Sequence, residues 1–371
     1  MSGVVGGHQP KFQFDRRKEM KKKNFGALCG VTAASVLVAG WVVANRPATE
    51  SSDYDGTVLF PSLLEDVDAL DTIAVRTKDG IATLKSTESG WVFVERDNYP
   101  VQSNKIGELV VKLTRLTKVE PKTSLKDRYD RLDLLDPEDK EDTRAKEVTL
   151  TDVDGEELAR LLVGKRKFTL GTSEGGTYVL LPDGPQAWLV TGELNPGARA
   201  RDWLVREIIN IKADDIRRIE IIHPDGEVLA ARKNTPDQLN YTVEEIPAGM
   251  ELRRDSIADD MGRVLSNLLL DDVKKAGAVE FSSATTIKAT FEGFDGFTVV
   301  VELIEDEEEN WLRFKGIAPS DNSGSDTSSW DETIASLNET TAGWVYQLPG
   351  YEVSAIKKRM AEMVRKPDEG A

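Results

Sequence analysis

The sequence predicts an α+β protein with one N-terminal transmembrane helix, followed by two tandem, similar modules of mainly antiparallel strands with an amphipathic helix each. Three observations predict this fold. An uncharged run near the N-terminus is long enough to cross a bilayer. Short runs of alternating apolar and polar residues are separated by turn sequences, as in strands and hairpins. The pattern of the first half recurs in the second half. The expected parts are a basic tail (1–24), the transmembrane helix (25–44), a linker (45–60), a first module (61–210) and a second module (211–366).

The basic tail differs sharply in charge from the rest of the chain. Residues 1–24 hold seven Lys or Arg and two acidic residues, a net charge of +5. The whole chain carries −17, which leaves −22 for the remainder. So acidic a body repels nucleic acid backbones, and we therefore expect no nucleic acid partner.

Residues 25–44 contain twenty residues without a charge. At 1.5 Å per residue this run spans a bilayer core of about 30 Å. The preceding cluster Lys21-Lys22-Lys23 stays in the cytoplasm by the positive-inside rule, and Trp41 suits the opposite interface. A cleaved signal peptide ending at Ala44 is the alternative, but its apolar segment is usually about 7–15 residues long. An anchored chain with its C-terminal part in the periplasm of a bacterial inner membrane is the expected topology.

Small residues lie on one face of this expected helix. Gly26, Gly30 and Ala34 are spaced four residues apart, which allows a second helix to approach closely. The same spacing also arises because small residues are common in membrane helices. These three residues are the candidate transmembrane contact.

The recurring pattern is carried by strands and Asp-Gly turns. The runs 70–75 and 216–221 both alternate apolar and polar residues, and each reaches Asp-Gly at the same interval, at Asp79-Gly80 and Asp225-Gly226. Asp-Gly between such runs is a strong hairpin signal because Gly accepts a positive φ. Further strands are expected over 81–84, 91–94, 147–151, 157–163, 177–181 and 187–190 in the first module, and over 227–231, 241–243, 286–291, 297–303, 310–314 and 343–347 in the second.

One helix is expected in each module after its aromatic strand. In the first module Ser103 is a plausible N-cap, and in the second Ser256 and Asp259 resemble a capping box. Apolar stripes follow at helical spacing. They consist of Ile106, Leu109, Val110, Leu113 and Leu116 in the first module and Ile257, Met261, Val264, Leu265 and Leu268 in the second. A further helix is expected over 331–337, and amphipathic segments over 203–209 and 351–364 close the modules.

No catalytic, cofactor-binding or metal-binding motif is predicted. The single cysteine, Cys29, lies inside the apolar run, and His223 is expected in a turn before Pro224. Residues 152–157 hold four carboxylates but are better explained by a hairpin at Asp154-Gly155 than by a calcium loop. Gly164-Lys165 lacks the upstream glycine of a phosphate-binding loop. With 65 acidic residues, neighbouring carboxylates alone do not indicate glycan chemistry.

The order of these segments resembles a known family, the domain of unknown function 4340. After the membrane helix, the strand pair, the Trp strand and the helix ending near Leu116, the resemblance continues at Tyr129-Asp130-Arg131-Leu132-Asp133-Leu134, Leu161-Leu162-Val163-Gly164, Thr177-Tyr178-Val179 and Trp188-Leu189-Val190. Members often have Tyr-Gly-Leu where this chain has Tyr129-Asp130-Arg131-Leu132. The resemblance covers most of residues 60–360 and supplies no catalytic residues.

The resemblance implies a cell-envelope accessory protein of an ABC-type export system of the gliding-motility kind. We therefore expect a non-enzymatic, extracytoplasmic interaction protein whose partner is an integral membrane permease. The alternatives are a glycan hydrolase that uses two converging carboxylates, and a glycan-binding module that exposes Trp91, Trp188 and Trp344 as an aromatic row. The sequence does not indicate an oligomeric state.

Overall fold

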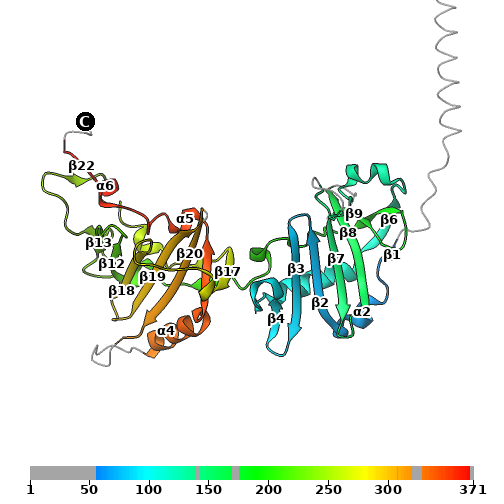
Figure 1. Ribbon diagram of the computed structural model, residues 1–371, viewed down its shortest axis with the longest axis horizontal. Coiled ribbons are helices and arrows are strands. Elements are labelled where there is room, and N and C mark those ends of the chain that lie inside the picture. Colours follow the sequence, from blue (N-terminus) through cyan, green and yellow to red (C-terminus); the bar gives the residue numbers. More distant parts are fainter. Residues whose placement is uncertain (1–55, 139–142, 169–174, 307, 320–327, 368–371) are drawn as a thin grey trace, which may run out of the picture. The chain divides into compact units, whose positions relative to one another are not determined.

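The computed structural model describes residues 56–138, 143–168, 175–306, 308–319 and 328–367 (Figure 1). The chain divides into two units, Met1–Asp55 and Gly56–Ala371, and the description below concerns the second. The expected tail, transmembrane helix and Gly26, Gly30 and Ala34 lie outside the described residues. Within the described part of the chain, no helix is long and apolar enough to span a membrane.

The first half of the described chain forms a ten-stranded sheet in which every neighbouring pair is antiparallel. The strand order is β1-β6-β10-β9-β8-β7-β2-β3-β4-β5. The strands are β1 (Thr57–Val58), β2 (Leu70–Thr77), β3 (Gly80–Thr87), β4 (Gly90–Phe93), β5 (Tyr99–Pro100), β6 (Thr117–Pro121), β7 (Lys146–Asp152), β8 (Glu157–Lys167), β9 (Gly176–Leu180) and β10 (Ala187–Thr191).

The second half forms an eight-stranded antiparallel sheet in the order β14-β13-β12-β18-β19-β20-β21-β17. Two short pairs, β11 with β16 and β15 with β22, lie outside the two large sheets. The strands are β11 (Glu207–Ile209), β12 (Ile216–Ile222), β13 (Val228–Arg232), β14 (Thr242–Val243), β15 (Glu251–Leu252), β16 (Leu268–Leu269), β17 (Asp272–Lys275), β18 (Ile287–Gly293), β19 (Thr298–Asp306), β20 (Glu309–Ile317), β21 (Trp344–Leu348) and β22 (Val364–Arg365).

The two large sheets share one strand order. Reading the first from β6 to β4 gives β6-β10-β9-β8-β7-β2-β3-β4, and reading the second from its β17 edge gives β17-β21-β20-β19-β18-β12-β13-β14. When the eight strands of each sheet are numbered in chain order, strands with the same number occupy the same position in the two sheets. The predominance of antiparallel strands with few helices agrees with the predicted α+β class, because alternating runs and Asp-Gly turns specify neighbouring hairpins.

The expected helix of the first module is present as α3 (Ser103–Thr114), with Ile106, Leu109 and Leu113 on its buried face. The N-cap is Gln102 rather than Ser103, and its side chain makes no capping hydrogen bond. The apolar stripe therefore locates the helix correctly, while the capping signal is misplaced by one residue.

The expected helix over 256–268 is wrong. The structure has turns here, one 3-10 helix at Met261–Arg263, and the start of β16. The Asp259 carboxylate accepts the Tyr241 N–H at 3.0 Å instead of capping a helix. A Cβ at Gly262 would lie 2.5 Å from Tyr241 Oη, so the chain passes directly against this ring. The apolar stripe is buried all the same, because periodicity reports burial and tertiary contacts decide the backbone conformation.

The other helices are α2 (Leu63–Asp66), α4 (Ser328–Thr341), α5 (Gly350–Val353) and α6 (Met360–Met363). Helix α4 includes the expected helical segment 331–337 and packs on β20 (Figure 1). The Asn338 side chain fixes this contact, since it accepts the Gly316 N–H at 2.8 Å and donates to the Gly316 carbonyl at 3.0 Å. The closing segment 203–209 is extended at β11, whereas 351–364 contains α5 and α6.

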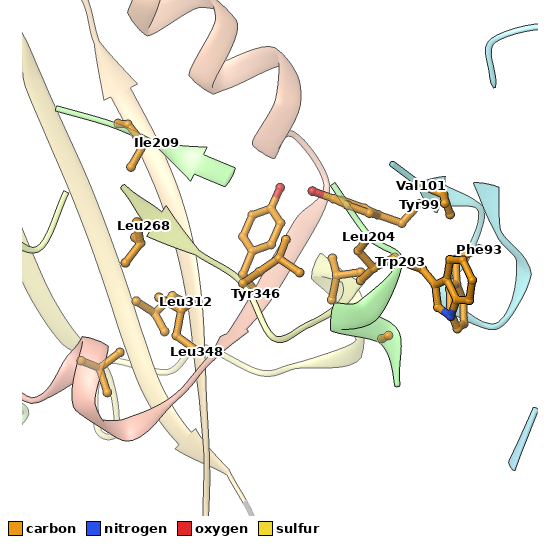
Figure 2. Packing of buried hydrophobic residues seen from close by; sticks show 14 of the residues in the cluster. Phe93, Tyr99, Val101, Trp203, Leu204, Ile209, Leu268, Leu312, Tyr346 and Leu348 are labelled. Atoms are coloured by element: carbon orange, nitrogen blue, oxygen red, sulfur yellow. The ribbon is translucent and has the colours of Figure 1, made fainter. Parts of the chain in front are cut away.

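A continuous cluster of buried apolar residues extends from the first sheet to the second (Figure 2). Tyr99 meets Trp344 edge to face, with ring centroids 5.0 Å apart, and lies 6.3 Å from the Tyr346 ring. Trp203 and Leu204, from the segment between the sheets, are buried in the same cluster. We call this contact region the junction.

One ion pair accompanies the apolar contact at the junction. The Arg96 guanidinium donates to both carboxylate oxygens of Asp272, at 2.5 and 2.7 Å. These hydrogen bonds raise the pKa of Arg96, while burial opposes the rise. Such two-point geometry fixes orientation as well as adding attraction. The junction therefore combines apolar packing with a directed polar contact.

Candidate functional site

A cavity of about 770 Å³ lies between helix α3 and the segment that leads from the first sheet toward the second. We call it the basic cavity. Its walls contain six basic and three acidic residues, in a chain whose net charge is −17. They are Lys105, Lys112, Lys146, Arg199, Arg201, Arg206, Glu108, Asp202 and Glu207.

Backbone hydrogen bonds hold the segment 194–207 in place. The Gln102 N–H donates to the Trp203 carbonyl at 2.8 Å, and the Val205 N–H donates to the Pro100 carbonyl at 3.0 Å. The Trp203 indole N–H donates to the Gly197 carbonyl at 3.1 Å. A Cβ at Gly197 would lie 2.9 Å from Trp203 Nε1, so only glycine permits this approach. The wall of the basic cavity is therefore built against the entry to α3.

Several cations of the basic cavity are neutralised by nearby carboxylates. Lys112 pairs with Glu108 at 2.8 Å on the helix surface. Arg201 and Arg206 share the carboxylate of Asp271, each at 3.2 Å. These pairs fix the positions of the wall.

Lys146 has a different environment. Its ammonium donates to Asn195 Oδ1 at 2.8 Å and to the Pro196 carbonyl at 2.7 Å, and both acceptors are neutral. Burial lowers the pKa of Lys146; nearby Asp202 opposes this effect and Arg199 adds to it. Among the described residues, no carboxylate lies within 4.0 Å of this ammonium. The half-buried charge is therefore solvated by amide oxygens rather than by a counter-ion.

A second cavity of about 790 Å³ lies on the first sheet beside Tyr129. Its apolar wall includes Leu134, Leu162 and Leu180. The Tyr129 hydroxyl donates to the Pro185 carbonyl, which ties the loop around Tyr129 to the loop that precedes β10. The charged residues of its lining include Glu147 and Arg160.

Glu147 connects two arginines at that edge and is itself only 8% exposed. Its Oε2 accepts from Arg76 Nε at 2.8 Å, and its Oε1 accepts from Arg160 Nε at 2.7 Å. Hydrogen bonding to Glu147 raises the pKa of Arg160, with burial opposing the rise. This carboxylate is committed to charge pairing within the fold.

Replacing Glu147 with alanine is expected to lower the free energy of unfolding by about 2–3 kcal/mol, because two partly buried guanidinium groups lose their common acceptor. Urea unfolding of the full-length protein in mild detergent measures the change. Glu157→Ala is the matched control, since Glu157 lies 4.0 Å from Arg160 and is 45% exposed. The control should change stability by less than about 0.5 kcal/mol. Equal losses in both variants would contradict a structural role for the Glu147 pairs.

A third cavity of about 500 Å³ borders the junction. Its lining includes Arg96, Arg201, Asp271 and Asp272, and all four take part in the ion pairs described above. Asp271 and Asp272, the neighbouring carboxylates of this cavity, therefore already have basic partners.

The residues singled out in the sequence have structural roles. The hairpin at Asp154-Gly155 is confirmed, with Asp152 Oδ1 accepting the N–H groups of Asp154 and Glu156 at 2.9 Å each. Gly164 and Lys165 lie inside β8, not at a strand-to-helix turn. Over the described ranges, no cluster of three or more His, Cys, Asp or Glu is arranged to hold a metal.

His223 is in a turn, as expected, because the Gly226 N–H donates to its carbonyl. It is also buried, and its Nε2 lies 2.9 Å from the Lys358 carbonyl. The sequence gives no sign of this second contact, which links the β12–β13 turn to the C-terminal segment.

The three tryptophans considered for glycan binding are packed against the body. Trp188 is 9% exposed and has the Lys118 ammonium 4.8 Å from its ring centroid. Trp91 and Trp344 are half-buried and pack against the main core. The structure therefore uses these rings mainly for packing.

Comparison with known proteins agrees with the resemblance in the sequence. A family model described as a domain of unknown function, DUF4340, matches residues 91–290. No curated protein and no solved structure matches this chain. The matched region runs from β4 to β18 and contains every residue that lines the basic cavity. Because the match covers more than half of the 371 residues, the chain belongs to the DUF4340 family.

Proposed function

We propose that this protein is a membrane-anchored, non-enzymatic accessory protein of an ABC-type export or gliding-motility-like system, with its large C-terminal part in the periplasm. The observation that carries the proposal is the uncharged run 25–44 with Lys21-Lys22-Lys23 before it and a strongly acidic chain after it. This order favours a single-pass anchor with a cytoplasmic N-terminus. The partner would be an integral membrane permease.

The described part of the chain supports an interaction role rather than acid–base chemistry. Three carboxylates in the cavity walls have basic partners: Glu147 pairs with two arginines, Asp271 with two arginines, and Asp272 with Arg96. A general acid or base needs a carboxyl group that is poised to exchange a proton with substrate. Carboxylates bonded to guanidinium groups are better suited to hold a fixed binding surface.

Glycan binding is the competing function, as a module or as a hydrolase. An aromatic platform requires exposed ring faces, whereas Trp188 is buried and Trp91 and Trp344 are half-buried. A hydrolase requires two converging carboxylates with an unoccupied space between them. Because the rings serve packing and these carboxylates serve ion pairs, the described contacts give less support to glycan binding than to the accessory role.

The test is affinity purification of the full-length protein from mild-detergent membranes, followed by mass spectrometry. A variant with Gly26→Leu and Gly30→Leu fills the small-residue face and is expected to lose an integral membrane partner that the wild type retains. Ala39→Leu is the matched control, because at 100° per residue position 39 faces away from Gly26. Recovery of the wild type without a permease would contradict the proposed function. Equal recovery with both variants would contradict the contact through this face.

A further inference from the structure

We propose that the basic cavity binds a small organic ligand through a phosphate or carboxylate group, and that Lys105, Lys146 and Arg199 hold this group. The proposal goes beyond the accessory function and does not depend on it. It concerns a ligand that the purified protein should bind without any membrane partner.

The first argument is that two of these three cations, Lys105 and Lys146, form no ion pair among the described residues. The Lys146 ammonium has only neutral oxygens at 2.7 and 2.8 Å. Lys105 makes no ion pair among the described residues. Arg199 forms one long ion pair, with its Nε 3.9 Å from Asp202 Oδ2. An anion in the basic cavity would therefore meet two ammonium groups that no carboxylate neutralises.

The Asp202 carboxylate is occupied by the backbone. Its Oδ2 accepts the N–H groups of Ala198 at 3.1 Å and of Arg199 at 3.0 Å. These bonds close the turn that carries Arg199. The carboxylate thus shapes the wall of the basic cavity and only partly offsets the positive charge of Lys146 and Arg199.

The second argument is the contrast between the basic cavity and the chain around it. The residues after the tail carry a net charge of −22, yet the walls of this cavity hold three more basic than acidic groups. A concave site whose walls carry an excess of positive charge attracts anions. Local attraction of an anion is therefore expected despite the acidic body.

The third argument is the size and chemistry of the walls. A volume of about 770 Å³ falls within the usual range of small-molecule sites, about 300–1,000 Å³. Leu109, Leu194 and Trp203 supply apolar wall next to the cations. Such a site suits an organic molecule with an anionic head rather than a bare ion. The Lys146 ammonium has three N–H donors, and only two of them are used by Asn195 and Pro196.

The experiment is isothermal titration of the full-length protein in mild detergent with pyrophosphate, citrate and the short-chain lipid dihexanoyl phosphatidic acid. Pyrophosphate and citrate represent soluble phosphates and carboxylates, and the lipid represents a headgroup source. Saturable binding of at least one probe is expected. Lys146→Gln and Lys105→Gln should each weaken that binding about tenfold or more, as the loss of a charge-assisted hydrogen bond predicts.

Lys315→Gln is the matched control, because it removes the same charge from an exposed position on β20, away from the lining of the basic cavity. It should leave the affinity unchanged within about twofold. Lys146 also donates hydrogen bonds to Asn195 and Pro196, so its replacement could disturb the fold. If Lys146→Gln does not fold, Lys105→Gln is the variant that decides. Binding of the lipid alone would support the site and assign the phosphate to a headgroup. Failure of all three probes to bind, or equal weakening in the control, would overturn the proposal.

Discussion

Replacing Tyr346 with alanine is expected to lower the free energy of unfolding by about 3–5 kcal/mol, the range for loss of a large aromatic side chain from a core. Tyr346 is 1% exposed and lies at the junction, 6.3 Å from the Tyr99 ring and 5.9 Å from the Phe314 ring. Its hydroxyl donates to the Thr340 carbonyl at 3.1 Å. Removing the ring therefore opens a cavity where the two sheets share their core.

Urea unfolding of the full-length protein in mild detergent measures the loss, and Tyr346→Phe separates the ring from the hydroxyl. The phenylalanine variant keeps the ring contacts and loses the hydroxyl, including its hydrogen bond to Thr340, so a decrease of about 1 kcal/mol is expected. Limited proteolysis should also cut Tyr346→Ala faster within the segment 194–207, whose Trp203 and Leu204 belong to the same core. A loss below about 1 kcal/mol in Tyr346→Ala would show that the junction is not a packed part of the fold.

The sequence predicts the hairpin strands well because their signals are local, whereas β6 and β17 of the two large sheets are not predicted. An alternating run followed by Asp-Gly specifies a hairpin from about a dozen residues. The observed β2–β3 and β12–β13 hairpins begin at Leu70 and Ile216, and the number of residues between these two positions equals that between the two Asp-Gly turns. The pairings of β2 with β7 and of β6 with β10 do not follow from hairpins, because these strands are not consecutive in the chain. The contact between the sheets is not predicted, because it joins residues as distant as Arg96 and Asp272.

The two expected helices show where a periodic pattern is insufficient. Both stripes are buried, but only the first becomes the helix α3. In the second, Gly262 must lie against the Tyr241 ring, and the Tyr241 hydroxyl lies 2.9 Å from the carbonyls of Ala213 and Ile216. These contacts fix a chain of turns, and they involve residues some 20–50 positions away that no local pattern includes.

The basic cavity could not be predicted for a related reason. Lys105, Lys146 and Arg199 come from α3, the start of β7 and the segment after β10. No motif joins them, and in a chain with 48 Lys or Arg single basic residues carry no information. The only local signal is the succession of Arg199, Arg201 and Arg206 within an otherwise acidic chain. Arg201 and Arg206 are paired with Asp271, so these two residues indicate structural ion pairs rather than a binding site.

Stability is expected to fall steeply above pH 10 because buried tyrosines resist ionisation in the folded state. Burial raises the pKa of Tyr346, with the charge of Tyr99 adding to the rise, and burial also raises the pKa of Tyr241, with Asp214 and Asp259 adding to it. In the unfolded chain tyrosine ionises near pH 10. Below that pH both states are protonated and the full stability is present.

Above pH 10 the unfolded state loses protons that the folded state retains, so each such tyrosine removes about 1.4 kcal/mol of stability per pH unit. Two groups should remove about 5 kcal/mol between pH 10 and pH 12. Urea unfolding across this range measures how the free energy of unfolding changes with pH. Tyr346→Phe should reduce this slope by about 1.4 kcal/mol per pH unit, the contribution of one proton. Tyr351→Phe is the control, because Tyr351 is 75% exposed and should leave the slope unchanged. A slope that is the same in wild type and Tyr346→Phe would mean that the Tyr346 hydroxyl ionises in the folded protein as readily as in the unfolded chain, and the junction would then have to be open to water at that ring.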